Sequence, residues 1–204
     1  VLESVPSVST LDSVSQVQAS SRVMSVSQVR PSLFLSGLDP ALNLSVLTSR
    51  GVTLVVNASG LEGVVYPRLD GLQVLSVPVQ DRPHAPLRQY FDLVSERISQ
   101  NQTGTTLVHC TAGRSRSPTL IMAHLMRCDG LSLRQAHEQV LERRPFIRPN
   151  AGFWRQLLDY EWALSGRNTV RMARTSGGVL PEASEGDIEQ NISPEFVFIL
   201  IDIN

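Results

Sequence analysis

The sequence contains no lysine, because all 18 of its basic residues are arginines. This absence excludes any mechanism that depends on a catalytic lysine. Only two cysteines are present, Cys110 and Cys128, which is too few for a disulfide framework and indicates a reducing compartment. There is also no run of about 18 apolar residues, so no transmembrane helix is expected.

Neither sign of charge dominates, since 19 acidic residues balance the arginines and the net charge is −1. Bulk binding to nucleic acid or to acidic membranes would favour a strongly basic chain, so neither is expected as a partner. The four histidines are scattered without Cys-His spacing, which gives no metal site. A hydrophobic fraction of 42% over 204 residues suits one globular domain with tails.

Hydrophobic patterning predicts strands and helices that alternate through the middle of the chain. Strands are expected at Val23–Val29, Leu33–Ser36, Val52–Asn57, Leu72–Val77 and Thr105–His109. Helices are expected from Asp39 to near Gly51, over Pro86–Gln102 and over Ser117–Cys128. Two more are expected to start at their caps, one at a capping box of Ser132 and Gln135 and one at Asn150. This order predicts an α/β domain with a central, mostly parallel sheet flanked by helices, whose ligands bind beyond the carboxyl ends of the strands.

One segment carries chemistry at that edge of the predicted sheet. Residues His109–Ser117 read HCTAGRSRS and lead from a strand into a helix. Such a loop turns its backbone N–H groups inward to bind an oxyanion, and the helix N-terminus adds positive potential. Gly113 permits a backbone conformation that a Cβ would penalise. Arg116 offers a planar fork for two phosphate oxygens.

The same positive field is expected to lower the pKa of the Cys110 thiol, which makes it a thiolate at neutral pH. A thiolate beside a bound phosphate is a nucleophile for phosphoryl transfer. Cys110 alone would more simply be a buried core residue, but Gly113, Arg116 and Ser117 at this spacing favour the nucleophile. Twelve helical residues, about 18 Å, separate Arg116 from Cys128, which we interpret as structural rather than as a redox partner.

The loop resembles the signature of the protein tyrosine phosphatase superfamily: His-Cys, two residues, Gly, two residues, Arg, then Ser or Thr. Further resemblance to the dual-specificity branch lies in Pro31–Gly37, Val77–Phe91, Ser117–Met126 and Arg144–Phe153, so it covers roughly Val23 to Gly166. It implies the protein tyrosine phosphatase-like fold of the dual-specificity type. Asn168–Glu185 resembles a small atypical subgroup whose C-terminal extension packs back on the domain.

The resemblance implies a role for each loop residue. Cys110 would be the nucleophile, Arg116 would bind phosphate through its side chain, and Ser117 would steady the thiolate as it leaves the phosphocysteine. The amides that bind phosphate would come from the backbone of Thr111, Ala112, Gly113, Arg114, Ser115 and Arg116.

Asp81 matches the general acid of the family, and a proton donor is needed because an alkoxide or phenoxide leaves slowly without one. The alternative is an ordinary turn aspartate before Pro83. His109 and Asn150 are expected to support the site, His109 by orienting the loop through hydrogen bonds and Asn150 at the start of the last helix.

We divide the chain into a flexible tail over residues 1–22, a catalytic domain over 23–166, a packed C-terminal extension over 167–185 and an apolar tail over 186–204. Phe196–Ile203 within that tail is strongly apolar and β-prone. It would pair with a sheet edge, form a homodimer contact or be an aggregation liability.

The sequence therefore predicts a phosphatase of phosphotyrosine and of phosphoserine or phosphothreonine in proteins, with no cofactor and no metal. We expect it in the cytoplasm or nucleus, with association with an organelle left open. One alternative is a phosphatase of lipid or other non-protein phosphates, which Arg114 favours and Thr111 disfavours. Another is a non-catalytic binder of phosphorylated partners, which the presence of Cys110, Arg116 and Asp81 disfavours.

Overall fold

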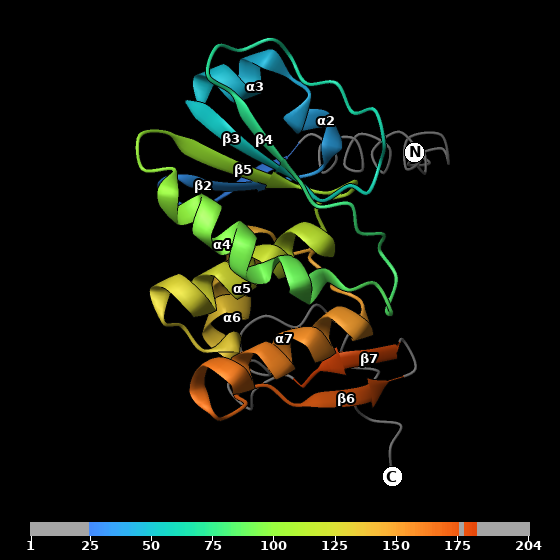
Figure 1. Ribbon diagram of the computed structural model, residues 1–204. Helices are drawn as coiled ribbons and strands as arrows, with labels where there is room; N and C mark the ends of the chain where they lie inside the picture. The colour runs from blue at the N-terminus through green and yellow to red at the C-terminus, as the bar shows by residue number, and fades with distance from the viewer. Residues whose placement is uncertain (1–24, 176–177, 183–204) are drawn as a thin grey trace, which may run out of the picture.

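The computed structural model describes residues 25–175 and 178–182. Five strands form a sheet in the order β1-β2-β5-β3-β4 (Figure 1). Their bounds are β1 Val26–Arg30, β2 Leu33–Ser36, β3 Val52–Asn57, β4 Gln73–Ser76 and β5 Thr105–His109. Strands β2, β5, β3 and β4 run parallel, and only β1 is antiparallel, at one edge. The predicted mostly parallel sheet is confirmed.

The centre of the sheet sets the position of the functional edge. Strands β3 and β5 are almost entirely buried, as expected for parallel strands covered on both faces, and β3 is also largely apolar. Ser36 and Asn57 both pair with His109 across the sheet. Strands β2, β5 and β3 therefore end at one level, and the segments that leave them begin side by side.

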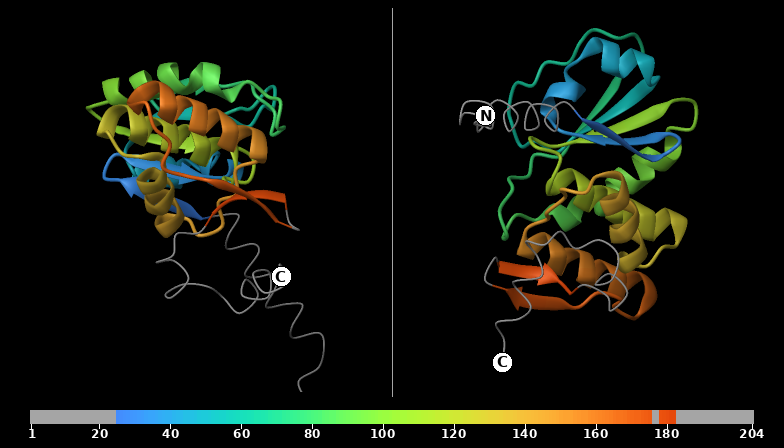
Figure 2. Two further views of the ribbon diagram at one scale, coloured as in Figure 1. Left: turned by 90° about the horizontal axis from the view of Figure 1, so that it is seen from below. Right: turned by 180° about the vertical axis from the view of Figure 1, so that it is seen from behind.

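Four helices lie on one side of the sheet (Figures 1 and 2). They are α4 Phe91–Gln100, α5 Arg116–Asp129, α6 Leu133–Arg143 and α7 Ala151–Ser165. Helix α5 lies at their centre and contacts α4, α6 and α7 as well as β2 and β5. Its residues from Arg116 to Met126 are all buried, so it forms the middle of the larger hydrophobic core. The short helices α2 Leu38–Ala41 and α3 Leu44–Ser49 lie on the other face over a smaller core.

Two predicted helix starts are confirmed by their hydrogen bonds. Ser132 and Gln135 form a complete capping box at α6. The Asn150 side chain accepts a hydrogen bond from Phe153 N at 3.0 Å and begins α7.

The expected single helix from Asp39 to near Gly51 is wrong. The chain forms α2 and α3 instead, and α2 starts at Leu38, after Gly37, without a side-chain cap. Asn43 interrupts the helix because its side chain accepts a hydrogen bond from Val46 N at 3.1 Å and starts a second one. The predicted helix Pro86–Gln102 begins as a 3₁₀ turn, η1 Leu87–Tyr90, before α4.

The segment after α7 returns along the domain. Val170 is buried in the larger core, and β6 Met172–Thr175 pairs with β7 Gly178–Pro181 beyond α7 (Figure 1). The predicted tail over residues 1–22 and the apolar run Phe196–Ile203 lie outside the described residues. Within the described ranges, no helix is both long and apolar enough to cross a membrane.

Candidate active site

The predicted phosphate loop lies between β5 and α5, at the carboxyl edge of the sheet. Cys110 directly follows β5 and is only 2% exposed, and Arg116 is the first residue of α5. Gly113 has a φ of +67°, and a Cβ there would lie 2.6 Å from the backbone carbonyl of Ser36. Glycine is therefore required here both by conformation and by space.

The carbonyl groups of the loop are all bonded to partners outside it. Thr111 O accepts from Leu38 N (3.0 Å), Ala112 O from Arg144 Nη2 (3.3 Å), Gly113 O from Arg144 Nε (2.7 Å), Arg114 O from Arg148 N (2.6 Å) and Ser115 O from Thr119 N (3.1 Å). In a trans peptide the N–H points opposite to the C=O. The loop amides are thereby turned inward, and Gly113 N donates to Cys110 Sγ at 3.2 Å.

Cys110 receives a second hydrogen bond from Ser117 Oγ, also at 3.2 Å. Burial alone raises the pKa of the Cys110 thiol, but the hydrogen bonds from Ser117 and the charge of Arg116 outweigh it, so the pKa lies below its ordinary value. Ser117 is fully buried inside α5, and the cap position is Ser115. The Ser117 hydroxyl thus serves the sulfur and not the helix end.

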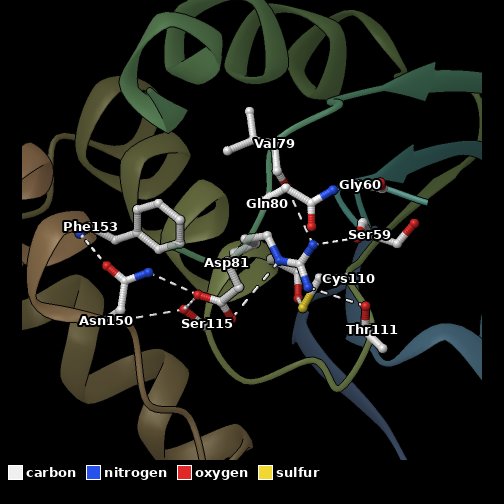
Figure 3. A network of polar contacts seen from close by, with 12 residues as sticks. Ser59, Gly60, Val79, Gln80, Asp81, Cys110, Thr111, Ser115, Asn150 and Phe153 are labelled. Atoms are coloured by element: carbon white, nitrogen blue, oxygen red, sulfur yellow. Dashed lines mark hydrogen bonds and ion pairs between the residues drawn. The ribbon is translucent and has the colours of Figure 1, made fainter. Parts of the chain in front are cut away.

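The Arg116 guanidinium is anchored along one side. Nη1 donates to the carbonyls of Ser59 and Val79, and Nη2 donates to Thr111 Oγ1 at 3.1 Å (Figure 3). Nε is buried and has no hydrogen-bond partner among the described residues. An unpaired buried donor costs about 1–3 kcal/mol. An oxyanion in the loop would satisfy Nε and Nη2 together, in the two-pronged geometry that phosphate favours.

Asp81 lies on the loop that follows β4, with its side chain 38% exposed. Its Oδ1 accepts hydrogen bonds from Ser115 Oγ and from Asn150 Nδ2, both at 2.8 Å (Figure 3). Its Oδ2 lies 4.0 Å from Arg116 Nε, on the side of the phosphate loop. Asn150 therefore both caps α7 and holds Asp81, and Oδ2 faces the phosphate loop.

His109 is buried and is fixed by hydrogen bonds at both ring nitrogens. Nδ1 lies 3.1 Å from Cys110 O, and Nε2 lies 2.6 Å from the hydroxyl of Tyr66. A carbonyl only accepts, so Nδ1 carries the proton and the Tyr66 hydroxyl donates to Nε2. Burial lowers the pKa of His109 to about 4, which keeps the ring neutral, and burial raises the pKa of Tyr66.

Tyr66→Phe is expected to lower kcat/KM by roughly 2- to 13-fold, the equivalent of one hydrogen bond of ~0.5–1.5 kcal/mol. Without the phenol, His109 loses the hydrogen bond that selects its tautomer. Its own hydrogen bond to the Cys110 carbonyl is then no longer fixed. The acid limb of the profile of kcat/KM against pH should move to higher pH. Tyr160→Phe is the matched control, because its hydroxyl makes an equally short bond, 2.6 Å to Asp92, away from the loop. A Tyr66 effect no larger than that of Tyr160 would contradict the assignment.

Three groups in the site were not selected by the sequence analysis: the Ser59 carbonyl, the Tyr66 hydroxyl and the Arg144 guanidinium. Each reaches the loop from a segment distant in sequence, and no local pattern marks it. Cys128 is exposed on the last turn of α5, and both cysteines are free.

Comparison with known proteins gives matches over most of the chain. Residues 33–163 match the family model of the dual specificity phosphatase catalytic domain. Dual specificity protein phosphatase 14 of Mus musculus is 44% identical over 163 residues, which cover 78% of this chain and 81% of that protein. Dual specificity protein phosphatase 21 of Homo sapiens is 42% identical, covering 84% and 90%. The crystal structure of human DUSP28 is 39% identical with a TM-score of 0.64, covering 68% of this chain and 94% of that one.

Proposed function

This chain belongs to the dual specificity phosphatase family and is a protein phosphatase, and on that premise we propose that Cys110 carries the phosphoryl group during hydrolysis. We propose phosphotyrosine and phosphoserine or phosphothreonine of proteins as its substrates. One observation carries the mechanism: the Cys110 sulfur lies in a loop whose carbonyls are all bonded outside it, beside Arg116 Nε, which has no hydrogen-bond partner among the described residues.

In the first step the Cys110 thiolate attacks phosphorus in line with the leaving oxygen. An S–P bond forms, the P–O bond to the substrate breaks, and Asp81 Oδ2 gives its proton to the departing oxygen. The loop amides and the free edge of Arg116 stabilise the negative charge of the transferring group. The support for Asp81 is its place beside Arg116 and its two hydrogen bonds at Oδ1.

In the second step water attacks phosphorus, and the Asp81 carboxylate takes up a proton from that water. The S–P bond breaks, inorganic phosphate forms, and Cys110 leaves as thiolate. Ser117 Oγ, 3.2 Å from the sulfur, donates to the charge that returns there. The hydroxyl therefore favours the second step more than the first.

Ser117→Ala is expected to slow the second step by roughly 10- to 150-fold, since a hydrogen bond to a charged group contributes ~1.5–3 kcal/mol. Rapid quench should show a burst of released phenol followed by slow turnover, with phosphocysteine trapped in acid. Ser132→Ala is the control, because Ser132 is a true helix cap. It should lower the melting temperature without a burst, and the same behaviour in Ser117→Ala would contradict the catalytic role.

The test of the proposed function compares substrates side by side. The wild-type chain should hydrolyse a chromogenic aryl phosphate, a phosphotyrosyl peptide and a phosphothreonyl peptide, all in the presence of a chelator. Faster hydrolysis of phosphoinositides than of the peptides would contradict the proposed protein substrates. Binding of the phosphopeptides without hydrolysis would contradict the proposed catalytic activity. Neither alternative is favoured, because the relatives are named as protein phosphatases.

We also propose a cytoplasmic or nuclear location, because a thiolate nucleophile needs a reducing compartment. Imaging of a fluorescent fusion tests it. A homodimer through Phe196–Ile203 stays a prediction, to be tested by light scattering, because that run lies outside the described residues.

A further inference from the structure

Arg144 is an arginine buried to 0% exposure, directly after α6. A buried arginine normally pairs with a carboxylate. Within the described residues, no ion pair joins Arg144 to an acidic side chain. Its donors go instead to backbone and hydroxyl oxygens, and the ring of Phe146 covers the guanidinium at 4.4 Å.

The guanidinium holds two consecutive carbonyls at the turn of the phosphate loop. Nε donates to Gly113 O at 2.7 Å, and Nη2 donates to Ala112 O at 3.3 Å. A carbonyl and the next N–H belong to one rigid peptide plane. The two held carbonyls therefore fix the direction of the N–H groups of Gly113 and Arg114.

Those two N–H groups are directed to the sulfur. Gly113 N donates to Cys110 Sγ at 3.2 Å. The backbone N–H of Arg114 is also a hydrogen-bonding group that helps to lower the pKa of Cys110, against the opposing effect of burial.

The third nitrogen of the Arg144 guanidinium, Nη1, reaches strand β1 and the residue before it. Nη1 donates to Ser25 Oγ at 3.0 Å and to Ser27 Oγ at 3.2 Å. Arg144 thus lies between the start of β1 and the phosphate loop, with donors to both. A lysine could not replace it here, because one ammonium cannot meet a planar pair of carbonyls and two hydroxyls together.

We propose that Arg144 is a positioning residue for the phosphate loop, which holds the carbonyls of Ala112 and Gly113 from outside and aims the following N–H groups at Cys110 and the bound phosphate. The inference deepens the proposed function and rests on it. It makes Arg144 the outer counterpart of Arg116, which binds the phosphate from inside.

The charge of Arg144 has a second effect. Burial lowers the pKa of Arg144 to about 10, and attraction to the Cys110 thiolate acts in the opposite direction. Arg144 therefore stays protonated at neutral pH. Because a Coulomb attraction acts equally on both partners, the same cation favours the thiolate.

The experiment separates charge from geometry in the full chain carrying Cys128→Ser, so that Cys110 is the only thiol. Arg144→Met removes charge and donors, and Arg144→Lys keeps the charge but loses the planar fork of donors. Three quantities are measured: the pH midpoint of iodoacetate alkylation, inhibition by inorganic vanadate, and kcat. Arg134→Met is the matched control, because Arg134 Nε also donates to a backbone carbonyl, that of Thr169 at 3.1 Å, on the segment after α7.

Arg144→Met should raise the alkylation midpoint by about one pH unit, ~10-fold in thiolate at fixed pH, and weaken vanadate about 10-fold. Arg144→Lys should raise the midpoint less than Arg144→Met does, because it keeps the charge, and should still lose affinity for vanadate and kcat. Arg134→Met should change only the melting temperature. An unchanged midpoint and vanadate affinity in folded Arg144→Met would overturn the proposal.

If Arg144→Met does not fold, the measurements on Arg144→Lys test the proposal. Wild-type vanadate affinity and wild-type kcat in Arg144→Lys would contradict the positioning role. Failure of the proposed function can be told apart from failure of the proposed role of Arg144. In that case the parent chain itself would show no hydrolysis and no low-pH alkylation of Cys110.

Discussion

Replacing Cys110 with serine is expected to abolish hydrolysis of an aryl phosphate. A serine hydroxyl is far less acidic than a thiol, so the loop hydrogen bonds that ionise sulfur cannot supply an alkoxide. Loss of the nucleophile costs on the order of 10⁶-fold in other hydrolases. Vanadate should still bind to Cys110→Ser, because Arg116 and the loop amides remain.

The chain offers a matched control, since Cys128 is its second free cysteine and is exposed on α5. Cys128→Ser should keep wild-type turnover and the wild-type pH profile. Activity of Cys110→Ser at even a tenth of wild type would show that another group attacks phosphorus.

Replacing Asp81 with asparagine is expected to lower turnover by ~10²–10⁴-fold on substrates whose leaving groups need a proton. The wild-type profile should be bell-shaped. Its acid limb reports formation of the Cys110 thiolate, and it lies on the acid side because the pKa of Cys110 is lowered. Its alkaline limb reports loss of the proton from the general acid, so Asp81→Asn should remove that limb alone.

The dependence on the leaving group separates acid catalysis from simple damage. The loss should shrink for aryl phosphates that leave without protonation, and a uniform loss would point to misplacement of the loop. Asp129→Asn is the control, because Asp129 is similarly exposed, at 33%, and pairs with Arg30 at 2.8 Å away from the loop. An intact alkaline limb in Asp81→Asn would assign the acid to another residue.

Much of the fold could be predicted because its signals are local. The bounds of Val52–Asn57 and Thr105–His109 match the structure, since the first is a short apolar run and the second is rich in β-branched residues. The caps Ser132 and Asn150 act on N–H groups three residues away, within reach of pattern reasoning. Asn43 shows the converse, because one side-chain hydrogen bond broke the expected helix and composition alone did not mark it.

The candidate site divides in the same way. His109–Ser117 is contiguous, so its residue types and spacing predict a phosphate loop. Tyr66 lies 43 residues from His109, and the Arg144 donor lies 31 residues from Gly113. Such partners are brought together by the three-dimensional fold and not by the local sequence. The sequence identifies the groups proposed to react, and the three-dimensional fold identifies those that hold them in place.

Glu161 shows where the cooperative unit of this fold ends. Its buried carboxylate accepts hydrogen bonds from Leu133 N at 2.8 Å and from the backbone and hydroxyl of Thr169 at 2.9 and 2.6 Å. It ties the first turn of α6 to a segment beyond the last helix, next to the buried Val170. Opening that segment would remove two hydrogen-bond donors from the Glu161 carboxylate, so we expect its amides to exchange with solvent only when α6 and α7 also open. We therefore expect the unit that unfolds together to extend at least to Val170, past residue 163 where the family match stops.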